Sequence, residues 1–270
     1  MTYEVEILEP LEALLARQAP VSLLKGPQSL SGRQNLHALS HRGKSLRGHA
    51  KTQNEDRHLA HTAHQHFALF DGLGGAVNSA RTAAQGAYFL SRLNLINRES
   101  RVLSAQMHTA LSQINTHIYK QSVRTGLPTG CTFAGLVRAD KGAIVYSAGD
   151  TRAYRYRAGL LTQLTVDHRA YDPVTKRSGV ARALGAAPVL PLDMCAIDVR
   201  ADDFYLLCTD GVHDTLNHSQ LTRIFTVGYD VGKQCTLLTE QLIRAKPQDD
   251  ASFLLLPGSA LMKNFRGSHE

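Results

Sequence analysis

Short apolar stretches bounded by turn residues recur along most of this chain, a pattern typical of β-strands. These stretches predict strands at residues 57–60, 65–70, 132–137, 143–148, 152–157, 160–165, 194–199, 204–208 and 252–256. Three longer stretches carry apolar residues at helical spacing and predict helices to about residue 93 from a cap at Asn78 or Ser79, over 101–123, and over 231–245. Because the strands are grouped around a helical pair and do not alternate with helices one by one, we expect an α+β fold of antiparallel sheets with helices packed outside.

The same pattern divides the chain into one domain and two terminal segments. Residues 1–36 are expected to form an extension, with a short amphipathic helix over 8–16 and a linker rich in Pro, Gly, Ser and Gln over 20–34. Residues 37–258 show neither an internal repeat nor a change in composition, so we interpret them as a single domain. Residues 259–270 form the predicted C-terminal tail.

Composition narrows the class of protein only by exclusion. The formal net charge of +7 comes with no compact Lys/Arg block or basic helix face, which argues against a nucleic-acid partner. No apolar run approaches the roughly 18 residues of a membrane span, and the acidic N-terminus is unlike a signal peptide. The four cysteines form no C-x-x-C pair and are expected to be buried free thiols. We therefore expect a cytoplasmic monomer without membrane contact.

The stretch from Phe67 to Ala76 runs an apolar segment into Asp71 and then into three glycines. A phosphate-cradling nucleotide loop is excluded, because Val77 stands at the last glycine position of a G-x-G-x-x-G fingerprint and no Gly-Lys-Ser/Thr follows. Two interpretations stay open at this point: a turn whose glycines relieve strain with Asp71 as a solvated cap, or a functional carboxylate held at a strand end.

Acidic residues recur where the predicted strands begin or end. Asp150 and Asp210 follow apolar strands, Asp249-Asp250 precedes the last strand, and Glu55-Asp56 precedes the first. Any one of them would be an ordinary turn acid. Several carboxylates that converge, however, repel one another and raise each other's pKa unless cations neutralise them. Because the chain offers no His or Cys at ligand spacing, these oxygen donors favour Mg²⁺ or Mn²⁺ over zinc.

At this point the sequence resembles a known family, the metal-dependent serine/threonine protein phosphatases of the PP2C (PPM) type. The resemblance covers roughly residues 37–256 and consists of motifs that follow the order of the family. These motifs are Asn54-Glu-Asp56, Asp71-Gly-Leu-Gly-Gly75, Gly130-Cys-Thr132, Gly149-Asp-Thr-Arg-Ala-Tyr154, Leu164-Thr-Val-Asp-His168, Ala183-Leu-Gly185, Thr209-Asp-Gly-Val-His-Asp214 and Asp249-Asp250. Leucine at the third position of the second motif is similar to the bacterial branch. The resemblance implies two stacked antiparallel sheets flanked by helix pairs, with a binuclear metal centre at one end.

The resemblance also implies roles for individual residues. Those that would contact metal are Glu55, Asp71, the carbonyl of Gly72, Asp150, Asp210 and Asp249. Asp71 would bridge two Mn²⁺ or Mg²⁺ ions, and Asp150 would hold a weaker third. Asp56 would orient water at the metals and Lys51 would grip the phosphate, the two implied catalytic roles, while Gly74 and Gly75 would let the backbone pass close to the ions. The implied partners are a phosphorylated protein substrate and a cognate Ser/Thr kinase.

The match departs from the family pattern in three places. Lys51 stands where the family usually has an arginine, so the phosphate would lose a bidentate partner. Asp250 replaces the usual asparagine, which makes it a minor alternative to Asp249 as the metal ligand. The flap between His168 and Ala183 is short. Residues 151–182 carry seven Lys/Arg against two Asp, which predicts either a basic rim for an anionic substrate or simply charged, exposed strands.

Three functions therefore remain to be compared. The first is a metal-dependent phosphatase that acts on phosphoserine and phosphothreonine in proteins through a metal-activated water. The second is a pseudophosphatase of the same fold that binds phosphoproteins without turning them over, suggested by Lys51 and the short flap. The third is hydrolysis of a small phosphorylated metabolite. The first is favoured, because a degenerate member is expected to have lost at least one of Asp71, Asp210 and Asp249, and all three are present.

Overall fold

The computed structural model describes residues 41–73, 77–95, 98–173, 176–226, 228 and 230–262. The predicted helix over 8–16, the linker over 20–34, and Gly74 and Gly75 lie outside these described residues, so the expectations placed on them stay predictions.

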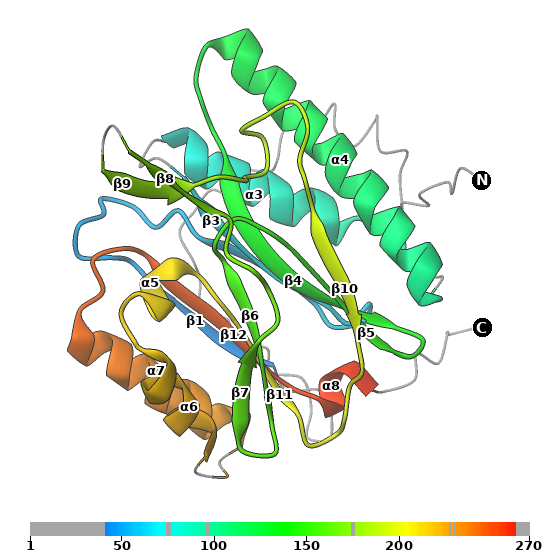
Figure 1. The fold of residues 1–270 in the computed structure, drawn as a ribbon, viewed down its shortest axis with the longest axis vertical. Helices are drawn as coiled ribbons and strands as arrows, with labels where there is room; N and C mark the ends of the chain where they lie inside the picture. The colour runs from blue at the N-terminus through cyan, green and yellow to red at the C-terminus, as the bar shows by residue number, and fades with distance from the viewer. Residues whose placement is uncertain are drawn as a thin grey trace.

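Two five-stranded antiparallel sheets form the centre of the molecule (Figure 1). The first has the order β1-β12-β11-β6-β7 and consists of β1 (Arg42–Leu46), β12 (Ala251–Pro257), β11 (Phe204–Cys208), β6 (Arg152–Arg157) and β7 (Leu160–Gln163). The second has the order β10-β5-β4-β3-β2 and consists of β10 (Asp193–Ile197), β5 (Gly142–Ala148), β4 (Cys131–Ala139), β3 (His66–Gly72) and β2 (Arg57–His61). A separate hairpin is made of β8 (Arg169–Asp172) and β9 (Arg177–Val180). Each predicted strand is found, and the predicted fold class is confirmed.

Helices cover the outer face of each sheet (Figure 1). The second sheet is covered by α3 (Val77–Ser91) and α4 (Ser100–Thr125), and the first by α6 (His218–Thr226) and α7 (Val231–Ala245). Single turns follow at α5 (Asp210–His213), directly after β11, and at α8 (Ser259–Met262), directly after β12. No helix among the described residues is long and apolar enough to cross a membrane.

The core lies in three layers because the central strands are buried on both faces. All seven residues of β3 are buried: Phe67 and Leu69 point into the layer between the sheets, whereas Ala68 and Phe70 pack against the helices α3 and α4. A third layer fills the space between the first sheet and the helices α6 and α7. Such doubly buried strands hold their ends firmly, which matters for the acids that follow them.

The sequence pattern did not predict several short or polar helices and strands. The edge strand β1 has the sequence Arg-Gly-Lys-Ser-Leu, with one fully buried position. Its antiparallel pairing with β12, and not an apolar sequence, makes this segment a strand. The helix α6 has only nine residues, and the hairpin β8–β9 carries mostly exposed side chains where these are described. The first residues of the predicted C-terminal tail form α8, whose Leu261 packs between the sheets.

The cysteine prediction is correct on oxidation state and partly wrong on burial. All four thiols are free, and Cys131 and Cys208 are buried as expected. Cys195, however, is exposed, because it lies on β10 at the edge of the second sheet.

Candidate metal centre

Antiparallel pairing brings the acidic strand ends together at one end of the two sheets. The start of β2 lies beside the end of β3, which places Asp56 next to Asp71. The end of β11 lies beside the start of β12, which places Asp210 next to Asp249-Asp250. Since β3 contacts both β11 and β12 across the interface between the sheets, the two acidic groups share one end of the sandwich.

Burial and mutual repulsion make the ionised forms of the acids at this end less favourable, which raises their pKa values. Burial, followed by the charge of Asp56, raises the pKa of Asp71 well above its usual range. Burial likewise raises the pKa of Asp56. Burial and the charge of Asp150 raise the pKa of Asp210 to about 6. Four carboxylates from four different strand ends are therefore close enough to interact, and their charges lack full compensation from the protein.

Three buried carboxylate oxygens in this group have no hydrogen-bond partner. They are Oε1 of Glu55, Oδ1 of Asp56 and Oδ1 of Asp210. A buried anionic oxygen without a partner is costly, so a cation or water held by it is the ordinary solution. Within the described residues, no three ligating side chains already surround a single point. This arrangement fits Mg²⁺ or Mn²⁺, hard ions that take a few carboxylates and keep several waters, better than an ion held by protein ligands alone.

Lys51 bridges two of the predicted metal ligands. Its Nζ lies 3.2 Å from Oε2 of Glu55 and 2.8 Å from Oδ1 of Asp249. Burial alone would lower the pKa of Lys51, but the hydrogen bonds to Asp249 and Glu55 raise it, so the ammonium stays charged. Lys51 thus lies beside two of the predicted metal ligands and pairs with their carboxylates, and its contact with phosphate stays a prediction.

The two acids before β12 have different environments. The buried carboxylate of Asp250 accepts the backbone N–H of Gly48 at 2.9 Å and that of Glu55 at 2.7 Å, so both its oxygens are engaged. The side chain of Asp249 is 44% exposed and pairs with Lys51. The geometry therefore favours Asp249 over Asp250 as the candidate ligand.

Gly72 is the last residue of β3 and lies where no side chain fits. A Cβ at this position would approach the backbone carbon of Ser79 to 2.7 Å. The start of α3 is thereby packed directly against the strand end that carries Asp71. The glycine has a packing role here in addition to the carbonyl contact predicted for it.

Two partners in this region were not predicted from the sequence. The hydroxyl of Thr209 donates to Oδ2 of Asp56 at 3.1 Å, which orients the carboxylate and leaves Oδ1 free. Arg169, the first residue of β8, places its Nε 2.9 Å from Oδ2 of Asp150. Thr209 precedes Asp210 in a motif and Arg169 follows another motif, but nothing local indicates which acid either one contacts.

The basic segment between residues 151 and 182 does not present a free positive rim. Five of its arginines each have a nitrogen within 3.2 Å of an aspartate oxygen: Arg152, Arg155, Arg157, Arg169 and Arg182. Most of this charge is therefore compensated locally. The alternative of simply charged strands explains it better.

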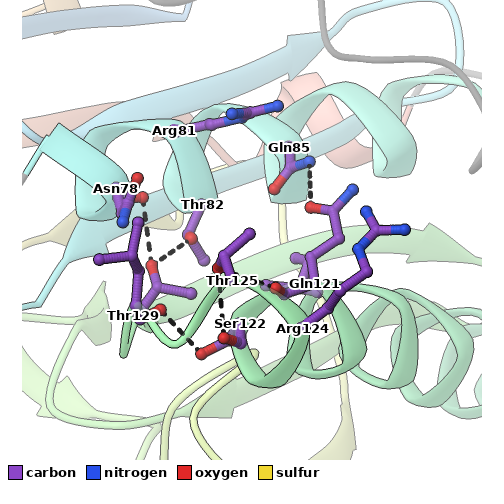
Figure 2. A pocket seen from close by; sticks show the side chains of 11 residues that line it. Asn78, Arg81, Thr82, Gln85, Gln121, Ser122, Arg124, Thr125 and Thr129 are labelled. Carbon is purple, nitrogen blue, oxygen red and sulfur yellow. Dashed lines mark hydrogen bonds between the residues drawn. The ribbon is translucent and has the colours of Figure 1, made fainter.

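A polar pocket of about 250 Å³ lies between α3 and α4, and Figure 2 shows side chains that line it. Hydrogen bonds join its walls, from Gln85 to Gln121 at 3.1 Å and between Thr82 and Thr129 at 2.5 Å. Its lining includes no carboxylate and none of the predicted site residues. The pocket therefore contributes none of the residues on which the predicted chemistry depends.

The helix-covered sandwich with acids at one end defines the PP2C/PPM class of metal-dependent phosphatase folds. A family model described as "Stage II sporulation protein E (SpoIIE)" matches residues 62–257. The chain therefore belongs to the SpoIIE family within this class.

Individual relatives agree with this assignment. The chain is 29% identical over 211 residues to "Probable protein phosphatase 1N" of Mus musculus, covering 66% of this chain and 52% of the relative. It is 25% identical over 236 residues to "Serine/threonine protein phosphatase PstP" of Mycobacterium tuberculosis, covering 80% of this chain and 44% of the relative. The chain thus spans about half the length of these curated relatives.

Solved structures show the same fold. PppA of Pseudomonas aeruginosa aligns with a TM-score of 0.74 at 24% identity, covering 81% of this chain and 97% of that one. The catalytic domain of PstP in complex with two manganese ions aligns with a TM-score of 0.66 at 24% identity, covering 81% of this chain and 97% of that one.

The raised pKa values predict an unusual pH dependence. A carboxyl whose folded pKa is raised binds its proton more tightly in the folded than in the unfolded chain, so the free energy of unfolding falls as pH rises through that range. For Asp210, with a pKa of about 6, the loss between about pH 5 and pH 7 is roughly 1 kcal/mol. Burial lowers the pKa of His58 and His64 to about 4, so these histidines add stability as pH rises and oppose the trend of Asp210. We therefore expect the trend in the difference between the parent and Asp210→Asn: thermal unfolding in EDTA should show that the stability of the parent relative to the variant falls from pH 5 to pH 7.

Added Mn²⁺ is expected to reverse this trend, because the carboxylates must be ionised to bind metal. The same unfolding experiment with Mn²⁺ in excess tests the reversal. If the stability of the parent relative to Asp210→Asn did not fall with pH in EDTA, burial and the neighbouring acids would not be raising the pKa of Asp210.

Proposed function

We propose that this chain hydrolyses phosphoserine and phosphothreonine in proteins, using water activated by two divalent cations. The observation that carries the proposal is the set of partnerless buried oxygens on Glu55, Asp56 and Asp210, among acids that raise one another's pKa. The two manganese ions of the PstP catalytic domain support two Mn²⁺ or Mg²⁺ ions as cofactor.

Four residues would bind the two ions in the proposed reaction. The two ions would be held by the carboxylates of Asp71, Asp210 and Asp249 and by the carbonyl of Gly72. When bound, two such ions lower the pKa of water from 15.7 toward about 7 and supply hydroxide for in-line attack on phosphorus.

Two acids at the start of β2 would hold the water. Asp56 is oriented by its hydrogen bond from Thr209 and directs its free Oδ1 as a proton acceptor, and Glu55 directs its free Oε1 in the same way. These oxygens can accept hydrogen bonds from water and orient its lone pair toward the substrate.

Lys51 would bind the phosphate as a point charge. Its ammonium carries three N–H donors, of which Glu55 and Asp249 engage two, so the third can donate to a phosphate oxygen. Cations bound by these acids would also weaken their contact with Lys51, because the cations replace its neutralising charge. The bridged position of Lys51 is also what keeps a binding-only protein of this fold as the second candidate function.

The test is release of inorganic phosphate from a phosphothreonine peptide with Mn²⁺ and then with EDTA. A small phosphorylated metabolite is assayed in parallel at the same concentration. Metal-dependent release from the peptide, in excess of release from the metabolite, is the expected result. A folded chain that binds Mn²⁺ and the peptide but releases no phosphate would instead be a binding module.

Substitutions of Lys51 are expected to separate phosphate binding from metal binding. Lys51→Ala should raise KM for the peptide about tenfold, because a charge-assisted hydrogen bond is lost. It should also tighten Mn²⁺ binding, because a competing cation leaves Glu55 and Asp249.

Lys51→Arg should lower KM through bidentate contact with phosphate. Titration calorimetry with Mn²⁺ and steady-state kinetics measure the two effects separately. An unchanged KM in both variants would remove Lys51 from the substrate site.

A further inference from the structure

Arg169 inserts a fixed positive charge beside the acids. Its Nε lies 2.9 Å from Oδ2 of Asp150, and its terminal nitrogen lies 3.3 Å from Asp214 and 3.9 Å from Asp210. The side chain of Asp150 is only 4% exposed. Within the described part of the chain, Arg169 is the one basic side chain that pairs with this carboxylate.

The backbone around Arg169 is tied to the loop that carries Asp150. The N–H of His168 donates to the carbonyl of Gly149 at 2.9 Å, and the ring Nδ1 of His168 accepts the N–H of Gly149 at 3.1 Å. At the end of β9, the N–H of Ala181 donates to the carbonyl of His168 at 2.7 Å and closes the same base of the hairpin. The base of the β8–β9 hairpin therefore holds the backbone of Arg169 beside the loop that carries Asp150, and the 35% exposed side chain reaches the carboxylate from there.

We infer that Arg169 is the resident cation of Asp150, so that the chain binds two divalent ions at its acidic end and leaves no place for a third. The inference rests on the proposed two-metal function and adds to it. A guanidinium stays protonated in proteins, so it neutralises Asp150 at every accessible pH. A third divalent ion would have to displace this fork and accept a positive neighbour, which opposes its binding.

The same contact makes Arg169 a positioning residue for the hairpin. Its fork joins the first residue of β8 to Asp150 and to Asp214, which belongs to the segment after β11. The short flap is thereby attached to the candidate metal centre through a side chain.

The test counts the ions that the folded chain binds. Equilibrium dialysis against Mn²⁺, with the metal measured by mass spectrometry, is expected to give two ions for the parent chain. Arg169→Gln, which keeps the length and removes the charge, is expected to bind a third, weaker ion. Arg169→Lys should return the count to two. The double variant Arg169→Gln/Asp150→Asn should also give two, because it removes the carboxylate that would hold the third ion.

Arg155→Ala is the matched control, because it removes an arginine from an ion pair with Asp198 that lies outside the acidic group. Its expected count is two. Circular dichroism shows that each variant is folded, and Arg169→Ala replaces Arg169→Gln should the latter fail to fold.

Three ions on the parent chain, or two on folded Arg169→Gln, would overturn the inference about Arg169 and leave the phosphatase proposal standing. No bound Mn²⁺ on any variant would overturn the two-metal function itself, and the inference with it. The two failures are therefore distinguishable.

Discussion

Asp71→Asn is expected to abolish metal-dependent phosphate release, with a loss of at least about a thousandfold in kcat. Asp71 lies at the firmly held end of β3, and burial and the neighbouring acids raise its pKa. An amide at this position keeps the shape of the side chain but removes the charge that would bind both ions. The measurement is phosphate release from the phosphothreonine peptide with saturating Mn²⁺.

A second readout separates this effect from simple misfolding. In EDTA the Asp71→Asn variant should be at least as stable as the parent, because a buried, repelled charge has been removed. The parent should gain stability on addition of Mn²⁺, about 2.7 kcal/mol at a hundredfold excess over Kd, and the variant should gain little. Asp202→Asn, at an exposed residue outside the acidic group, is the matched control and should behave as the parent does. A variant with parental turnover would exclude Asp71 as the bridging ligand.

Exchanging the two adjacent acids before β12 for asparagine is expected to give opposite results. Asp249→Asn should weaken Mn²⁺ binding and lower kcat about a hundredfold or more, because it removes a half-exposed candidate ligand. Asp250→Asn should leave Mn²⁺ binding intact. Its carboxylate is occupied by the N–H groups of Gly48 and Glu55 and is not available to a metal.

The stability of Asp250→Asn depends on two opposing terms. The amide can accept only one of the two N–H groups, which costs about 1–3 kcal/mol. Burial raises the pKa of Asp250, so removal of its charge offsets part of that cost. We expect a change in the free energy of unfolding below about 2 kcal/mol, measured by denaturant titration in EDTA. Loss of Mn²⁺ binding in Asp250→Asn but not in Asp249→Asn would reverse the ligand assignment.

Much of the fold could be predicted because its central strands are strongly apolar. The strands β3, β4, β5, β11 and β12 are buried over nearly their whole length, so their residues report burial directly. The strand β1 could not be predicted in this way, because its polar sequence joins the sheet through backbone pairing with β12 and contributes only the partly buried Leu46 to the core cluster under α6 and α7. The hairpin β8–β9 was not predicted for a similar reason: its two strands pair with each other and join neither five-stranded sheet.

The candidate site likewise contains residues that the sequence predicted and contacts that it did not. The acids Asp71, Asp150, Asp210 and Asp249 could be found from sequence, because each follows or precedes an apolar strand and such positions are readable along the chain. Which groups neutralise them could not be found. Lys51 and Asp249 are separated by nearly two hundred residues, yet their side chains lie 2.8 Å apart.

The sequence by itself thus determined the class of fold, the acids at the strand ends and the oxygen-donor chemistry, because burial periodicity and residue type are local properties. The tertiary structure decided which of two adjacent acids is engaged by backbone N–H groups, which oxygens stay without a partner, and that Arg169 pairs with Asp150. Those contacts depend on strand register and sheet packing, which set distances between residues far apart in the chain.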